Sequence, residues 1–208
     1  MCSSDLYNAP AYNTRLVKKE ELPSTYEEFL QKTQWKGRIA IDSADREWML
    51  GIFRHFGEEK GRKLLEDIVR TLNPVIVDGH LALARALAAG EYMVALSNYS
   101  MLTSNMAFTG APSEFFPLDP VSMFISQAGV SARAPHPNAA LLAANFFISR
   151  EAQQFAAQTG RLPTRDDVEP NPKDALVRLR SKTVIPILIN GDESRAAQKI
   201  FDDIFKKR

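Results

Sequence analysis

The sequence has almost no cysteine, and its positive and negative charges are nearly balanced. Only one of its 208 residues, Cys2, is a cysteine, which excludes an internal disulfide and any Cys-x-x-Cys motif. The 26 lysines and arginines are balanced by 25 aspartates and glutamates, which gives a net charge of +1. Nucleic-acid binding usually requires a clear basic excess, so the composition predicts no nucleic-acid partner.

Several functional motifs are also missing. No apolar run approaches the length of a membrane span, and the first residues lack the charged and apolar regions of a signal peptide. Of the three histidines, His55 could share a helix face with Glu59, but such a pair is more often a solvated face than a metal site. No Ser/His/Asp series, glycine-rich phosphate loop or paired metal motif supports a catalytic interpretation.

The hydrophobic pattern predicts strands that alternate with helices. Apolar and β-branched runs predict strands at 11–17, 37–43, 92–96 and 121–130. Apolar stripes with capping residues predict helices at 22–30, 44–56, 64–72, 80–90, 135–149, 149–158 and 192–206. The fold class is therefore α/β with open twisted sheets. We expect the segment 161–174 to be a loop, and Trp48 to belong to the core.

Two strand ends carry clustered polar side chains. In α/β sheets, ligands bind outside the carboxyl ends of the strands, where helix N-termini supply free N–H groups. The first cluster comprises Asp42, Ser43 and Asp45, and the second comprises Asn98, Tyr99 and Ser100. Each is ambiguous by itself, because Asp and Ser before a helix are usually caps, and a tyrosine at a strand end is usually half-buried with a solvated hydroxyl.

Several segments, in order, resemble the extracellular solute-binding proteins of ABC importers, in the group that binds ferric ion, polyamines, thiamine or phosphonates. The most specific stretches are WKGRIAI (35–41), APHPNAA (134–140) and ISREAQ (148–153). YNTRLV, LPSTYEEFL, GEYMVALSNY and GAPSEFFPLDP support them, as does the run that ends in TGRLPTR. The similarity extends from Ala11 to Val168, about three quarters of the chain.

The resemblance implies a type 2 periplasmic-binding-protein-like fold, in which two α/β lobes are joined by crossing strands and clamp the solute between them. Residues 7–14 would form a crossing strand and residues 15–110 the second lobe. Residues 111–208 would be the returning part of a first lobe that is incomplete. Such a returning half-lobe would leave apolar faces uncovered.

The start of the sequence fits the same interpretation. "MCSSDL" (1–6) matches one reading frame of a common sequencing adapter, and the resemblance begins in mid-fold just after it. We therefore expect residues 1–6 to be a non-native leader and the chain to be a C-terminal fragment. The alternative is an ordinary start codon followed by a frayed terminus.

The resemblance also implies roles for the two polar clusters. In ferric binders, the strand that matches VALSNY ends in two adjacent tyrosines that ligate iron; here the matching pair is Tyr99 and Ser100. A phenolate suits Fe³⁺, but a serine hydroxyl cannot replace the second one, which puts iron in doubt. Ser43 and the helix N–H groups suit an anion, such as a synergistic carbonate or a phosphonate, whereas Asp42 and Asp45 favour a cation.

The sequence therefore predicts a periplasmic or membrane-anchored extracellular transport receptor. It would capture Fe³⁺ or a compact organic ion and deliver it to the membrane permease of an ABC transporter, with Tyr99 as the metal ligand if the solute is iron. Two alternatives remain open: an enzyme on the same scaffold, because fold does not fix function, and a fragment without binding activity.

Overall fold

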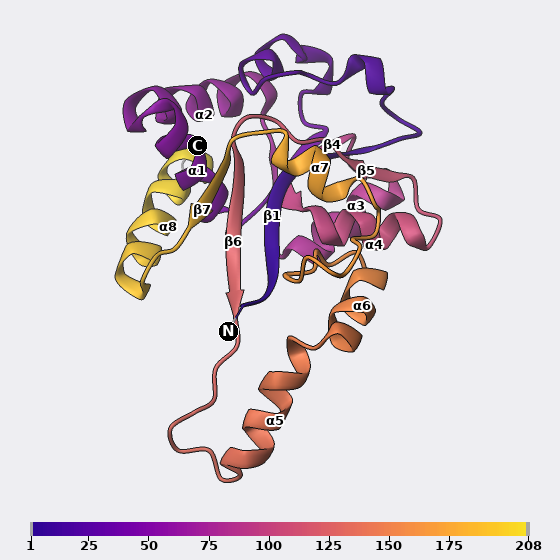
Figure 1. Ribbon diagram of the computed structural model, residues 1–208. Helices are drawn as coiled ribbons and strands as arrows, with labels where there is room; N and C mark the ends of the chain where they lie inside the picture. The colour runs from indigo at the N-terminus through magenta and orange to yellow at the C-terminus, as the bar shows by residue number, and fades with distance from the viewer. Residues whose placement is uncertain (1, 207–208) are drawn as a thin grey trace.

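The structure is a computed structural model that describes residues 2–206. Its centre is a seven-stranded sheet with the order β3-β2-β4-β1-β6-β7, in which β5 also pairs with β1 (Figure 1). The strands are β1 Cys2–Asn13, β2 Ile39–Asp42, β3 Val75–Val77, β4 Val94–Tyr99, β5 Ser113–Phe115, β6 Val121–Gln127 and β7 Val184–Ile187. This mixed architecture confirms the predicted α/β class.

Eight α-helices connect the strands or flank the sheet in the described part of the chain. They are α1 Arg46–Phe56, α2 Glu58–Leu72, α3 His80–Ala89, α4 Ser100–Phe108, α5 Pro137–Phe147, α6 Arg150–Gln158, α7 Ala175–Arg180 and α8 Gly191–Phe205. Short 3₁₀ turns occupy Lys19–Glu21, Glu27–Gln31 and Thr33–Trp35. No helix in residues 2–206 is long and apolar enough to span a membrane.

Strand β1 joins two groups of parallel strands. Strands β2, β3 and β4 run parallel to one another, as do β6 and β7, and β1 pairs antiparallel with both β4 and β6. The register places Asn8 of β1 directly opposite Tyr99, the last residue of β4. The carboxyl ends of β2, β3 and β4 therefore meet at one edge of the sheet, beside β1.

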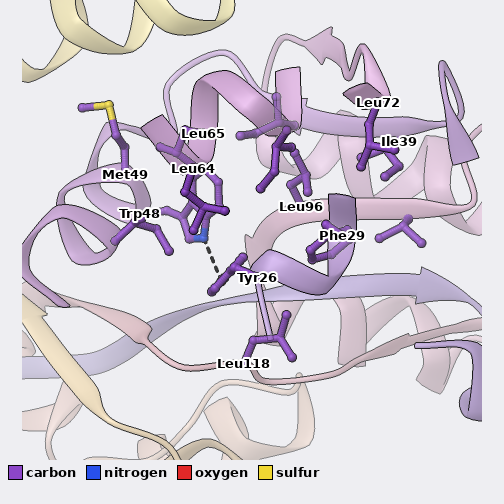
Figure 2. Close-up of a cluster of buried hydrophobic side chains, with 14 of the residues drawn as sticks. Tyr26, Phe29, Ile39, Trp48, Met49, Leu64, Leu65, Leu72, Leu96 and Leu118 are labelled. Atoms are coloured by element: carbon purple, nitrogen blue, oxygen red, sulfur yellow. Dashed lines mark hydrogen bonds between the residues drawn. The ribbon is translucent and has the colours of Figure 1, made fainter. Parts of the chain in front are cut away.

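An aromatic core fixes the position of helix α1 (Figure 2). The side chains of Trp48 and Tyr26 have no solvent exposure, and the Trp48 indole N–H donates to the Tyr26 hydroxyl at 2.9 Å. Phe205 of α8 packs on Trp48, with ring centroids 6.4 Å apart. The prediction that Trp48 is a core residue is confirmed.

The elements differ from the sequence prediction in three respects. The strand predicted at 11–17 ends at Asn13, because the Asn13 side chain accepts the Arg15 N–H and turns the chain. The helix predicted at 22–30 is only the 3₁₀ turn Glu27–Gln31. The elements not predicted are β3, α4, β5, α7 and β7.

Helices α5 and α6 carry exposed apolar side chains. Figure 1 shows α5 at the bottom of the view, away from the sheet. The exposed large apolar residues of these two helices are Leu141, Leu142, Phe146, Phe147 and Phe155. Exposed apolar area of this kind is uncommon on a folded domain and contributes nothing to its stability.

Candidate functional site: a corner formed by three strand ends

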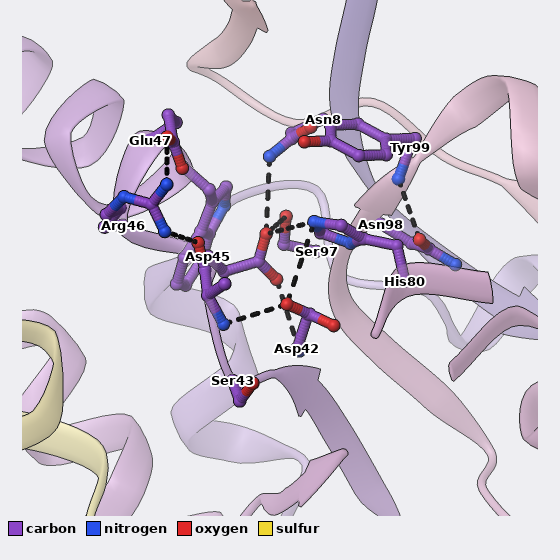
Figure 3. A network of polar contacts seen from close by, with 12 residues as sticks. Asn8, Asp42, Ser43, Asp45, Arg46, Glu47, His80, Ser97, Asn98 and Tyr99 are labelled. Atoms are coloured by element: carbon purple, nitrogen blue, oxygen red, sulfur yellow. Dashed lines mark hydrogen bonds and ion pairs between the residues drawn. The ribbon is translucent and has the colours of Figure 1, made fainter. Parts of the chain in front are cut away.

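The candidate site lies at the edge where β2, β3 and β4 end (Figure 3). Asp42 is the last residue of β2, His80 is the first of α3 after β3, and Tyr99 is the last of β4. Asn8 joins them from β1, because it is paired with Tyr99. We call this group, with Asp45 and Asn98, the strand-end corner.

Two buried carboxylates hold the loop between β2 and α1 in shape. Asp42 and Asp45 are each only 1% exposed to solvent. The Ala44 N–H donates to Asp42 Oδ1 at 2.8 Å, and the Asp42 N–H donates to Asp45 Oδ2 at 3.3 Å. Asp45 Oδ1 also accepts from Asn8 Nδ2 at 3.4 Å and from Ser97 Oγ at 3.3 Å.

The backbone N–H groups of the loop 42–46 all donate hydrogen bonds within the protein. Besides those of Asp42 and Ala44, the Ser43 N–H donates to Val77 O, the Asp45 N–H to Asp42 O and the Arg46 N–H to Ala44 O. Each N–H group from residue 42 to residue 46 therefore has an acceptor within the protein. The expected anion site at Ser43 and the start of α1 stays a prediction, because these bonds account only for the N–H groups of residues 42–46.

Burial shifts the ionisation of the groups in the corner. Burial raises the pKa of Asp45 well above its ordinary value, and the nearby negative charge of Asp42 adds to the rise. Burial also raises the pKa of the Tyr99 phenol, with further contributions from Asp45, Glu47 and Asp42. Burial lowers the pKa of His80, although Asp42 opposes that change.

His80 is a site residue that sequence reasoning missed. Its Nε2 lies 3.8 Å from Asp42 Oδ1 and 3.6 Å from Asp45 Oδ1. Its ring packs on that of Tyr99, with centroids 4.0 Å apart. The sequence did show a histidine at the start of a predicted helix. It gave no reason to place this histidine at a strand end, because the three-residue strand β3 was not predicted.

Four buried polar atoms in the corner have no hydrogen-bond partner within the described chain: Asn8 Oδ1, Asp42 Oδ2, His80 Nδ1 and Asn98 Nδ2. Buried polar groups normally find partners, since leaving one unpaired costs about 1–3 kcal/mol. Asn98 lies close enough to His80 to raise the pKa of the imidazole through a side-chain hydrogen bond, so Asn8 Oδ1 and Asp42 Oδ2 are the clearer unpaired atoms of the four. Unpaired buried acceptors of this kind mark the corner as a candidate site.

The structure brings some of the predicted site residues together and separates others. Asp42, Asp45, Asn98 and Tyr99 meet in the corner, and Asn98 Oδ1 accepts the Tyr99 N–H at 2.9 Å. Ser43 lies on the side of the loop away from Tyr99 in Figure 3, and its Oγ donates to Asp78 Oδ1 at 2.6 Å.

The predicted partner of Tyr99 is turned inward. Ser100 begins helix α4 and is only 3% exposed. Among the residues that the structure describes, no group of three His, Cys, Asp or Glu side chains is arranged to hold a metal ion.

Comparison with known proteins establishes the family. The model of the bacterial extracellular solute-binding protein family matches residues 7–181. This chain belongs to that family. Solved structures of periplasmic binding proteins share this fold and have two lobes. This solute-binding protein aligns with only part of the length of each of them.

Two relatives illustrate the similarity. Iron uptake protein A1 of Synechocystis is 32% identical over 71% of this chain and 44% of its own length. Iron-bound HitA from Pseudomonas aeruginosa has a TM-score of 0.74 at 22% identity, with 98% of this chain and 68% of HitA covered.

A second solved structure has the same fold. The Trichodesmium FutA protein, in complex with iron and citrate, has a TM-score of 0.71 at 21% identity, with 100% of this chain and 70% of FutA covered. This solute-binding protein therefore spans 44% of the length of its curated relative and 66–70% of these solved structures and of the periplasmic protein P5PA.

Proposed function

We propose that this protein is the solute-binding component of a periplasmic ABC importer. It captures a small ion, Fe³⁺ or a compact organic ion, at the strand-end corner and delivers it to the membrane permease. The family and the solved relatives are binding proteins rather than enzymes, and members of the family are extracellular. The capture step breaks no bond.

The observation that carries the proposal is the convergence of polar side chains from three strand ends. Ligands of open α/β sheets bind outside the carboxyl ends of the strands. Asp42, His80 and Tyr99 come from the ends of three neighbouring strands, and buried polar atoms of Asn8 and Asp42 have no partner within the described chain. A solute site explains both the convergence of these side chains and the unpaired atoms. Helix capping explains only the hydrogen bonds within the loop 42–46.

The proposal includes the lobe boundaries. Residues 7–14 form a crossing strand, residues 15–110 the second lobe, and residues 111–208 the returning part of the first lobe, except that the last helix, α8, packs on α1 of the second lobe. The antiparallel pairing of β1 with β6, in the order Asn8 with Ser122 and Tyr7 with Met123, supports two strands that pass between lobes in opposite directions. On this plan the corner faces the space between the lobes, where closure of the hinge would trap a solute.

Iron remains one candidate solute, because the cyanobacterial relative is named for iron uptake and HitA is iron-bound. In that case Tyr99 supplies a phenolate, which requires the metal charge to overcome the raised pKa of the phenol. Asn98 and Ser100 would orient it, and the remaining ligands would have to come from outside the corner.

A titration with Fe³⁺, supplied as its nitrilotriacetate complex, tests the iron branch. Binding through Tyr99 should produce a visible phenolate-to-iron charge-transfer band that disappears in Tyr99→Phe. Absence of the band, together with calorimetric binding of an organic ion, would remove iron and keep the transport proposal. Chemical turnover of any bound solute would instead support an enzyme on the same scaffold.

A further inference from the structure

Helix α8 contacts the site from outside the strand-end corner. One stripe of this helix is apolar and packs in the core cluster that contains Trp48 of α1. The buried residues of the stripe are Ala197, Phe201, Ile204 and Phe205. Ser194 and Gln198 lie beside the stripe, four residues apart and half-buried, so they share one face of the helix. We call these two residues the polar edge of α8.

The polar edge holds the loop between β2 and α1 by its carbonyl groups. Gln198 Nε2 donates to Ser43 O at 3.0 Å. Arg46 Nη1 donates to Ala44 O and to Gln198 Oε1, each at 3.2 Å. Arg46 Nε donates to Ser194 Oγ at 2.8 Å. The helix therefore contacts Ser43 O directly, and it contacts Ala44 O through the guanidinium of Arg46.

The peptide groups of Ser43 are held from two sides. Its N–H donates to Val77 O of β3 at 2.8 Å, and its carbonyl oxygen accepts from α8. Ser43 precedes Asp45, the N-cap residue of α1, so its carbonyl group takes no part in the hydrogen bonds of that helix. A carbonyl group shielded from water needs a donor from another element, and Gln198 supplies it. In Figure 3 the yellow ribbon at the left lies on the side of the loop away from Tyr99.

The loop fixed in this way carries both carboxylates of the corner. Asp42 is the last residue of β2, and Asp45 is the N-cap residue of α1. Asp45 Oδ1 accepts from Asn8 Nδ2 at 3.4 Å, and His80 Nε2 lies 3.6 Å from the same oxygen. A displacement of the loop would change both distances. The geometry of the corner therefore depends on a hydrogen bond between residues 155 positions apart in the sequence.

We propose that Gln198 and Ser194 are positioning residues of the solute site. They act on the solute through the loop that carries Asp42 and Asp45, and not by contact with it. The inference rests on the proposed function, which identifies the corner as the solute site. It assigns a part in binding to a helix that lies outside residues 7–181, the segment that the family model matches.

Gln198→Met tests the inference, because methionine keeps the length and the helix propensity of the side chain but has no donor for Ser43 O. The readout is the side-chain amide signal of Asn8 in NMR spectra of the ¹⁵N-labelled chain. Asn8 belongs to β1 and reports on Asp45, to which it donates. We expect this signal to shift in Gln198→Met. The matched control is Lys199→Met, at the exposed next position of α8, which should leave the signal unchanged.

Ser194→Ala gives a second measurement through Arg46. The substitution removes the acceptor of Arg46 Nε and raises the helix propensity, so α8 should stay folded. We expect the Asn8 signal to shift in the same direction as in Gln198→Met, but by less, because Gln198 still donates to Ser43 O. A loss of stability alone does not move the signals of the folded state. An unchanged Asn8 signal in both variants would therefore overturn the inference.

Titration with two probes separates this inference from the transport proposal. The probes are Fe³⁺, as its nitrilotriacetate complex, and spermidine, a compact organic cation. Gln198→Met should bind the probe that the wild type binds about three- to tenfold more weakly, as expected for the loss of one hydrogen bond, and Lys199→Met should bind it equally well. Equal binding by Gln198→Met would overturn the inference and leave transport standing. If the wild type binds neither probe, the transport proposal fails, and the Asn8 signal decides whether α8 positions the corner.

Discussion

The ring of Tyr99 packs on the imidazole of His80, with centroids 4.0 Å apart and 43° between the planes. The contact joins the end of β4 to the start of α3, the helix that precedes β4 in the chain, so the two ends form one surface. Directly behind it lie Asp42 and Asp45, both buried. A tyrosine at the end of a strand is unremarkable, but a tyrosine and a histidine that cover two buried carboxylates together form a candidate site.

Asp45 should make the stability of the protein depend on pH. Its pKa in the folded state is raised, so between its ordinary value of about 4 and that raised value the folded state binds a proton that the unfolded state lacks. Stability from this group is therefore greatest at low pH and falls as pH rises through the raised pKa. Asp45→Asn removes the titration.

Urea unfolding of wild type and Asp45→Asn at pH 5 and pH 8 measures this effect. The wild type should lose stability relative to the variant on going from pH 5 to pH 8, by about 1.4 kcal/mol for each pKa unit titrated in that interval. A difference between the two proteins that does not change with pH, or that changes in the opposite direction, would contradict the assignment.

Gly51 should be required for close packing of α1 on β6. A Cβ atom at this position would lie 1.9 Å from Ser122 Oγ and 3.1 Å from Ser122 Cβ. Gly51→Ala should therefore destabilise the protein by about 1–3 kcal/mol despite the better helix propensity of alanine. Adding Ser122→Gly should recover much of the loss, and chemical denaturation of both variants checks it. A double variant no more stable than Gly51→Ala would exclude this contact as the cause.

The hydrogen bond between Trp48 and Tyr26 should stabilise the aromatic core. Tyr26→Phe leaves the buried indole N–H without its acceptor, at an expected cost of about 1–3 kcal/mol. The double variant Tyr26→Phe/Trp48→Phe also removes the donor. Its measured cost should be less than the sum of the two single costs, because the bond is lost only once. Additive costs in a double-mutant cycle would show that the bond contributes nothing measurable.

Two leucines on helices should differ sharply in their contribution to stability. Leu65 of α2 has no exposure, and Leu65→Ala should cost about 2–5 kcal/mol. Leu142 of α5 is 72% exposed, and Leu142→Ala should change the free energy of unfolding by no more than about 0.5 kcal/mol. Urea unfolding of the two variants measures both changes. Similar losses at the two positions would mean that the α5 face is covered in solution.

The sequence predicted the elements whose apolar residues follow a clear period. Helix α1 is an example, because Trp48, Met49, Ile52 and Phe53 form its buried stripe. Helix α4 could not be found in this way, since its buried residues are Ser100, Thr103 and Ser104 and its apolar residues follow no stripe. Three-residue strands such as β3 are too short to show any period.

The candidate site was predicted only in part, because only some of its residues follow elements with a clear apolar period. Asp42, Asp45, Asn98 and Tyr99 follow strands that the pattern indicated, and the structure brings them together. His80 follows the unpredicted β3, and Asn8 reaches the corner only through its pairing with Tyr99 across two strands. That register depends on contacts between segments about ninety residues apart, which no local pattern encodes.

The position at which a solute binds can be measured directly. Amide chemical shifts of the ¹⁵N-labelled chain can be followed during titration with spermidine and, separately, with Ga³⁺ as a diamagnetic substitute for Fe³⁺. We expect saturable shifts centred on residues 42–46, 78–80 and 97–100, with the α5–α6 helices unaffected. Saturable shifts confined to α5 and α6, or none at the strand-end corner with either probe, would contradict a solute site at the three strand ends.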